Sequence, residues 1–80
     1  MSGCAERVAT LIRGLDPVRH AAEIGRLRSC RTLAALEALA RDAWLTQTAA
    51  GERLRLVRHG SGTFLVVAYV DGWTRTLSQA

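Results

Sequence analysis

The chain has 80 residues, of which 49% are hydrophobic, and its eleven arginines and seven acidic residues, with no lysine, give a net charge of +4. This length corresponds to one domain, and the hydrophobic fraction is too high for an intrinsically disordered chain. The longest apolar run, Phe64–Val70, has seven residues, whereas a membrane-spanning helix needs roughly 20.

Three helices are predicted in the first half of the chain. Apolar residues recur at helical spacing over residues 3–14, which indicates the first helix. Asp16-Pro17 opens the second, because Asp is a good N-cap and Pro fits the first helical position, and this helix is expected to end near Ser29. Thr32 caps the third, which runs from residue 33 to about residue 46 and is apolar around more than half of its circumference.

Two turn signals divide the last third of the chain into three strands. Asp71-Gly72 between apolar runs predicts a hairpin with a type I′ turn, and Gly60-Ser61 suits a type II′ turn with Gly in the first central position. Thr63–Val70 is then the middle strand of an antiparallel meander that covers residues 53–77, after a linker at residues 48–51.

The order of elements predicts an α+β fold in which three N-terminal helices pack on a three-stranded antiparallel β-meander. We expect a single domain over residues 1–80, with a helical part at 3–46 and a sheet part at 53–77.

The predicted turns also set which residues pair across the sheet. They pair Leu56 with Leu65, Val70 with Trp73 and Val66 with Leu77. One face is then uncharged and is expected to seat the helices: Leu54, Leu56, Leu65, Val67, Tyr69, Thr74 and Thr76. The other face carries three arginines and two aromatic residues among valines and alanine: Arg53, Arg55, Phe64, Trp73 and Arg75.

This second face has two interpretations. Phe64 and Trp73 are buried under the first helix with the arginine stems at the edge, or the face is an exposed apolar patch rimmed by arginine, which usually marks a binding site. Under the second interpretation the partner-binding residues are Arg53, Arg55, Phe64, Trp73 and Arg75.

The sequence predicts no enzyme, and therefore no catalytic residue, cofactor or metal. His59-Gly60-Ser61-Gly62 does not match the Gly-x-Ser-x-Gly pattern of a nucleophile elbow and does not join a strand to a helix. His20 is expected on the surface. Cys4 and Cys30 have no metal-ligand spacing and are expected to be reduced structural residues.

Nucleic-acid binding is the alternative function. Arg26, Arg28 and Arg31 cluster at the junction of the second and third helices, and three helices before a hairpin resemble a winged helix-turn-helix. The start of the third helix, however, offers almost no polar side chain to read a base edge, which leaves only backbone contacts. An arginine-rich sheet face with aromatic rings is also how several RNA modules bind single strands.

In size and build, a compact basic chain with one adhesive sheet face resembles the small phage and mobile-element inhibitors of the anti-CRISPR type. The resemblance rests on no motif, and many such inhibitors are acidic DNA mimics, whereas this chain is basic. It implies an inhibitor that binds a host protein or ribonucleoprotein complex, such as a CRISPR effector, and blocks its processing of nucleic acid. We expect a cytoplasmic monomer or weak homodimer without a signal peptide or membrane partner, because no basic segment precedes an apolar one at the start.

Overall fold

The structure is a computed structural model that describes residues 3–42, 46–47 and 51–80. Within them lie three helices: Cys4–Arg13 (α1), Ala21–Arg28 (α2) and Leu33–Arg41 (α3). The strands are Thr46–Gln47 (β1), Arg53–Arg58 (β2), Phe64–Val70 (β3) and Trp73–Gln79 (β4). They form one antiparallel sheet in the order β1-β2-β3-β4. The predicted α+β class, with helices before strands, is confirmed.

Several predicted boundaries were wrong. The third helix ends at Arg41 rather than near residue 46, and residues 43–45 of that prediction lie outside the described residues, as do residues 48–50 of the predicted linker. Strand β1 was not predicted, and it adds a short edge to the predicted meander of β2, β3 and β4. Strand β4 continues to Gln79, beyond the predicted end at residue 77.

Side-chain caps begin the third helix and the single turn that precedes the second. The Asp16 carboxylate accepts hydrogen bonds from the backbone N–H groups of Val18 and Arg19, at 2.9 and 2.8 Å. These bonds cap a single turn that precedes α2, so that the regular helix begins later than predicted, at Ala21. The hydroxyl of Thr32 accepts from the N–H of Ala35 at 3.1 Å, which confirms the predicted cap of α3.

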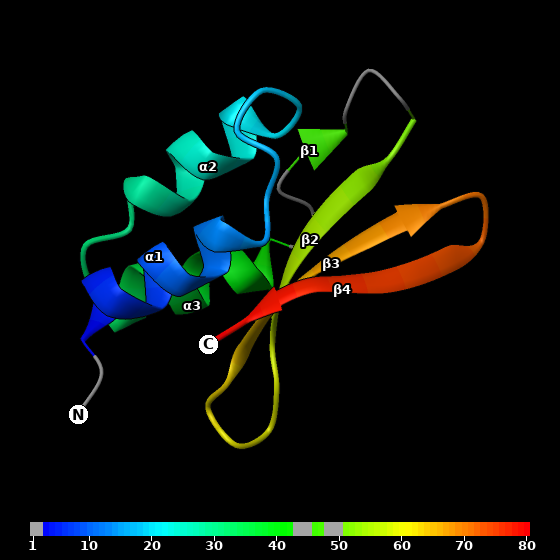
Figure 1. The fold of residues 1–80 in the computed structure, drawn as a ribbon. Helices are drawn as coiled ribbons and strands as arrows, with labels where there is room; N and C mark the ends of the chain where they lie inside the picture. Colours follow the sequence, from blue (N-terminus) through cyan, green and yellow to red (C-terminus); the bar gives the residue numbers. More distant parts are fainter. Residues whose placement is uncertain (1–2, 43–45, 48–50) are drawn as a thin grey trace.

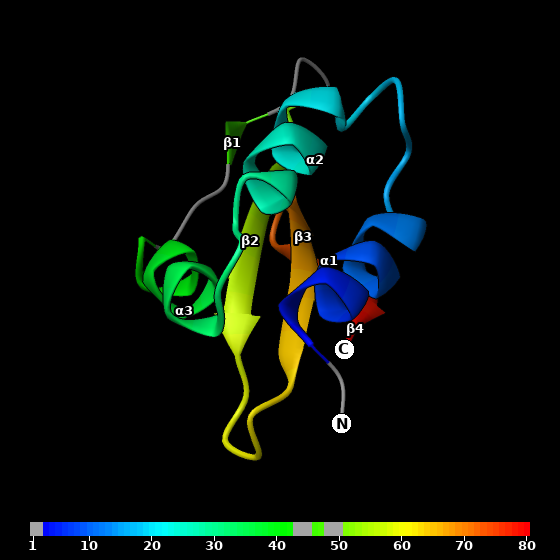
Figure 2. The same ribbon diagram turned by 90° about the vertical axis from the view of Figure 1, so that its left-hand side faces the viewer.

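The helices form one layer that covers one face of the sheet (Figures 1 and 2). The hydrophobic core lies between the two layers. Its buried members are Val8, Leu11 and Leu15 with Ile24, Leu27, Cys30, Leu36 and Ala40 on the helical side, and Leu54, Leu56, Phe64, Val66 and Ala68 on the sheet. Arg7 of α1 lies at the edge of this core. Its guanidinium is 6.0 Å from the centre of the Phe64 ring and donates a hydrogen bond to the carbonyl oxygen of Gly62 at 2.7 Å.

The turn between β2 and β3 differs from the predicted one by one residue. The N–H of Gly62 donates to the carbonyl oxygen of His59 at 2.9 Å, and the N–H of His59 donates to Thr63. Gly62 has φ of 86°, whereas Gly60 does not have a positive φ. A three-residue loop that ends with a left-handed glycine therefore replaces the predicted type II′ turn. As a result, Leu56 pairs with Val66 and not with Leu65.

The second hairpin has the predicted turn, with φ of 47° at Asp71 and 82° at Gly72, and Val70 pairs with Trp73 as expected. The predicted pairing of Val66 with Leu77 is wrong, because a bulge in β4 places Ser78 opposite Val66.

The change of register reverses the predicted roles of the two faces on the middle strand. Phe64, Val66 and Ala68 are buried, and Leu65, Val67 and Tyr69 are only half-buried on the opposite side. The extra loop residue brings Leu54 and Leu56 onto the face of Val66, which makes that face apolar on both strands. It moves Arg53 and Arg55 to the other face, so that the helices can cover the sheet without burying these two charges.

Candidate functional site

The structure distributes the predicted partner-binding residues over three places. Phe64 is part of the core and only 2% exposed. Arg53 and Arg55 pair with Tyr69 and Val67 on the face that no described helix covers, here called the open face. Trp73 and Arg75 lie on the helix side of the sheet, in the rows of Val70 and Ala68. Trp73 and Arg75 are therefore brought together on one face of the sheet, and Arg53 and Arg55 on the other.

Trp73 and Arg75 lie where the helical layer no longer covers the sheet. The β3–β4 hairpin extends beyond the helices (Figure 1). At its end Trp73 is 80% exposed and Val70, directly opposite, is 37% exposed. An exposed tryptophan backed by a β-branched residue is a large apolar surface that the fold itself does not use.

Beside Trp73 the surface is hollowed to a volume of about 290 Å³. We call this the hairpin hollow. It is lined by Arg19, Glu52, Ala68, Val70, Trp73, Thr74 and Arg75. Ala68 and Val70 are its apolar part, and Arg19 and Arg75 are its cations. In the part of the chain that the structure describes, neither of these two guanidiniums forms an ion pair.

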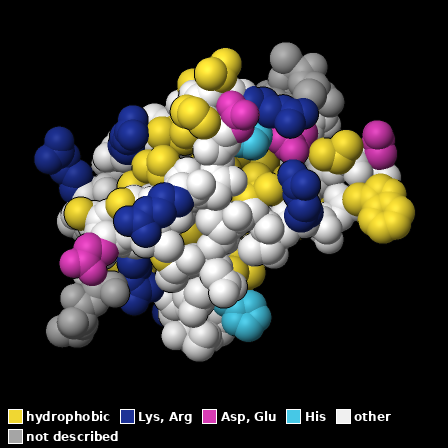
Figure 3. Space-filling model, viewed as in Figure 1, with side chains coloured by type: hydrophobic (Ala, Val, Ile, Leu, Met, Phe, Trp, Pro, Cys, Tyr) yellow, Lys and Arg dark blue, Asp and Glu magenta, His cyan; other side chains and the backbone are white. Residues whose placement is uncertain are grey.

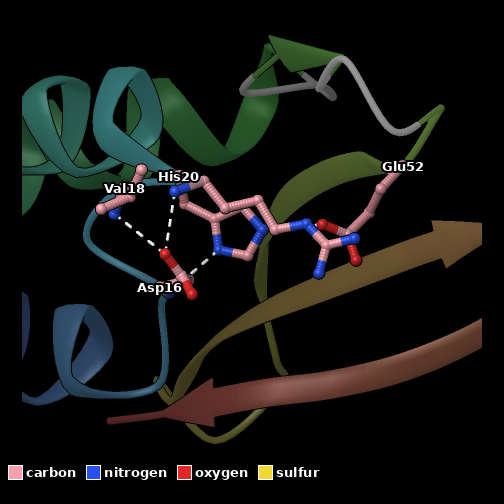
Figure 4. Close-up of polar contacts among 5 residues, drawn as sticks. Asp16, Val18, His20 and Glu52 are labelled. Atoms are coloured by element: carbon pink, nitrogen blue, oxygen red, sulfur yellow. Dashed lines mark hydrogen bonds and ion pairs between the residues drawn. The ribbon is translucent and has the colours of Figure 1, made fainter.

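Glu52 is the acid of the hairpin hollow, and His20 holds it in place. Nε2 of His20 lies 2.7 Å from Oε1 of Glu52, and both residues are buried. On the other side of the ring, the backbone N–H of Asp16 donates to Nδ1 at 3.1 Å (Figure 4). Because Nδ1 accepts that bond, the proton of the neutral ring is on Nε2 and is donated to Glu52. The prediction that His20 is a surface residue was wrong.

The arrangement of His20 favours a positioning role over a chemical one. A general base needs a free lone pair, and the lone pair on Nδ1 of His20 is already taken by the Asp16 N–H. The described residues hold no group of three or more His, Cys, Asp and Glu side chains that could bind a metal. The hairpin hollow combines two guanidiniums, an indole and a small apolar floor.

The three predicted nucleic-acid residues are all exposed. Arg26 and Arg28 lie in the last turn of α2, and Arg31 follows in the linker to α3. Arg28 and Arg31 line a separate hollow beside α1, and Arg26 does not line it.

The two cysteines are free thiols. The thiol of Cys4 lies 3.5 Å from the carbonyl oxygen of Cys30. Burial, and to a smaller extent the neighbouring Cys4, raises the pKa of the Cys30 thiol above 9.0, which keeps it protonated at neutral pH.

Sequence reasoning missed Arg19, His20 and Glu52. The Asp16-Pro17 cap was recognised, and this cap places Arg19 and His20 in the turn that follows it. No local pattern links this turn to Glu52, which lies 32 residues further along the chain from His20.

Comparison of the chain with protein-family models, with curated proteins and with solved structures finds no match. Among the described helices none has the length and apolar character required to cross a membrane.

Proposed function

We propose that this chain is a non-enzymatic binding module that docks on a protein partner through the hairpin hollow, with Trp73 as the anchor. The observation that carries the proposal is the 80% exposure of Trp73 next to a hollow lined by Arg19 and Arg75. Tryptophan and arginine are the residue types that contribute most to binding at protein interfaces.

The free energy that burial of Trp73 could contribute to binding is large enough for an anchor residue. Burial of an aromatic side chain removes about 150–250 Å² from water. At about 25 cal/mol per Å² this gives roughly 4–6 kcal/mol before the costs of association are subtracted. Arg19 and Arg75 favour a partner surface that carries carboxylates, because a guanidinium binds a carboxylate through two parallel hydrogen bonds.

Within this function, the narrower proposal is an inhibitor of the anti-CRISPR type that blocks a nucleic-acid-processing complex. It is supported by the length of 80 residues, the net charge of +4 and the partner chemistry of the hollow. A basic chain does not imitate DNA, so such an inhibitor would dock on an acidic patch of the complex. The cytoplasmic location remains part of this proposal.

The open face supports a second candidate, the binding of single-stranded nucleic acid. Arg53 lies opposite Tyr69, and Arg55 is the next residue on the same face of β2. A tyrosine ring with neighbouring arginines can stack a base and contact its phosphates.

A pull-down tests the first candidate. The immobilised protein is used to capture partners from nuclease-treated host extract, and its affinity for the purified partner is then measured. The W73A/R75A double variant is expected to lose at least about tenfold in affinity, equivalent to about 1.4 kcal/mol. The control is L33A/R41A, which removes the same classes of exposed side chain from α3. Unchanged affinity of W73A/R75A, or equal loss in the control, would overturn the proposal.

A titration with oligonucleotides tests the second candidate. Binding through the open face should weaken in Y69A and R53A and should fall with salt, with a log–log slope of about −0.7 per phosphate contacted. If free RNA and DNA do not bind at low salt, this candidate is excluded.

A further inference from the structure

A groove runs between α1 and α2, on the helical side of the molecule and away from the hairpin hollow. It consists of two adjoining hollows of about 680 and 320 Å³. Both are lined by Ile12 and Arg28, which makes them continuous. In Figure 3 apolar side chains lie between cationic side chains over these helices. These cations are all arginines, because the chain has no lysine.

The floor of the groove is aliphatic. Ala5, Ala9 and Ile12 line it from α1, and Ala21 and Ile24 line it from α2. The small alanines keep the floor open to a third element, and Ala5, Ala9 and Ala21 are exposed. Among the described residues no aromatic side chain lines either hollow, so these residues offer a nucleic-acid base no ring on which to stack.

The charges around this floor are all of one sign. Arg13, Arg28 and Arg31 line the groove, and none of the other described residues that line it is a carboxylate. In the described part of the chain these three arginines form no ion pair. Asp16 follows Leu15 at the end of the groove, but its carboxylate accepts from the N–H groups of Val18 and Arg19. The groove therefore complements a ligand that is apolar along one side and acidic along its flanks.

We propose that the groove between α1 and α2 binds an acidic amphipathic helix of a protein partner. An amphipathic helix laid in an apolar groove is a recurring mode of peptide recognition, with apolar anchors at positions i, i+3 or i+4, and i+7. The ten residues of α1 form a wall about 15 Å long, which matches a partner helix of about three turns. This site is separate from the hairpin hollow, so its failure would leave the function proposed above untouched.

The test uses a fluorescein-labelled synthetic peptide with leucines at i, i+3, i+7 and i+10 and glutamates at the intervening positions, and it measures anisotropy. The wild-type protein is expected to bind, and R28A/R31A is expected to bind about tenfold more weakly, since two charge-assisted hydrogen bonds to the glutamates are lost. The matched control R41A/R58A removes two exposed arginines that line neither the groove nor the hairpin hollow, and it should bind as the wild type does.

Two further variants separate a groove site from general attraction between opposite charges. A9E places a carboxylate on the floor at an exposed helical position, so it should weaken binding without unfolding the protein. R28E/R31E should lose the glutamate peptide and should bind the same peptide with lysines in place of the glutamates.

Four results would overturn the proposal: no binding of the leucine–glutamate peptide, equal binding of a peptide with serines in place of the leucines, equal loss in R41A/R58A, or unchanged binding in A9E. Competition by an oligonucleotide that depends on Arg28 and Arg31 would reassign the groove to nucleic acid. Competition by vesicles of anionic lipid with the same dependence would reassign it to a membrane surface.

Discussion

Glu52 and His20 form a buried polar pair that also shapes the hairpin hollow. Nε2 of His20 and Oε1 of Glu52 lie 2.7 Å apart, and because both residues are buried, water has little access to this hydrogen bond. We expect E52A to lower the free energy of unfolding by about 1–3 kcal/mol, because the Nε2–H of His20 is left without an acceptor. E52Q should cost less, because the amide oxygen of Gln can still accept. Urea denaturation followed by circular dichroism measures both.

An exposed ion pair provides the control for this prediction. Glu37 lies 3.4 Å from Nε of Arg58, with both side chains roughly half exposed. Such a pair contributes about 0–1 kcal/mol, so E37A should change stability little. Equal losses in E37A and E52A, or in E52Q and E52A, would contradict the role assigned to the buried bond.

Asp16 makes the stability of the turn before α2 dependent on pH. Hydrogen bonds from the backbone N–H groups of Arg19 and Val18 hold the pKa of its carboxyl below the ordinary value of 3.8. The carboxylate therefore stabilises the folded chain fully above pH 3.8, and this contribution is lost as the pH falls through the lowered pKa. In D16N, whose amide does not titrate, the fall in stability below pH 3.8 should be shallower. An NMR titration that places the midpoint of Asp16 at or above 3.8 would contradict this.

At the level of single residues, the sequence predicted those positions whose role is local. The caps at Asp16 and Thr32 depend only on residues two or three positions away, and both are present. His20 was misplaced because its partner Glu52 is remote in the sequence and is reached only in the folded chain. The binding roles of Trp73 and Arg75 remain predictions, although the structure does place the two side by side.

At the level of the elements, the turn between β2 and β3 determines the register of these strands, and the predicted register was wrong because the turn was. His59-Gly60-Ser61-Gly62 contains two glycines, and each permits a different loop. Glycine at position 60 suits a type II′ turn, and glycine at position 62 suits a three-residue loop with a left-handed last residue. Local rules cannot choose between them, since the choice depends on which side of β3 packs with Leu54 and Leu56 beneath the helices. Asp71-Gly72 offers no such choice, and its turn was predicted correctly.

The two glycines of this turn should respond differently to substitution. Gly62 has φ of 86°, and a side chain is strained in that conformation, whereas Gly60 has no positive φ and nothing within 4 Å of an added Cβ. We expect G62A to lower the free energy of unfolding by about 1 kcal/mol or more, and G60A to be nearly neutral. A type II′ turn would give the opposite order. Thermal or urea unfolding of the two variants decides between the two loops.

At the scale of the whole molecule, the register between β2 and β3 decides which side of the middle strand joins the core. Every strand alternates between its two faces, so the class and the order of elements could be predicted from periodicity alone. The choice of face could not, because β3 is apolar on both sides: Phe64, Val66 and Ala68 alternate with Leu65, Val67 and Tyr69. The register with β2 breaks this symmetry: it sets Val66 beside Leu56 in the core and Val67 beside Arg55 on the open face.

Two adjacent valines on β3 test this account with the same chemical change. Val66 is fully buried beneath the helices, and Val67 is half-buried on the open face, opposite Arg55 and Thr76. V66A should lower the free energy of unfolding by about 1.5–3 kcal/mol, because it removes two buried methyl groups and leaves a cavity in the core. V67A should cost less than half as much, because its methyl groups are already partly in contact with water. The midpoint and slope of urea denaturation measure both. A larger loss in V67A than in V66A would mean that the helices cover the other face, the one that carries Arg53 and Arg55.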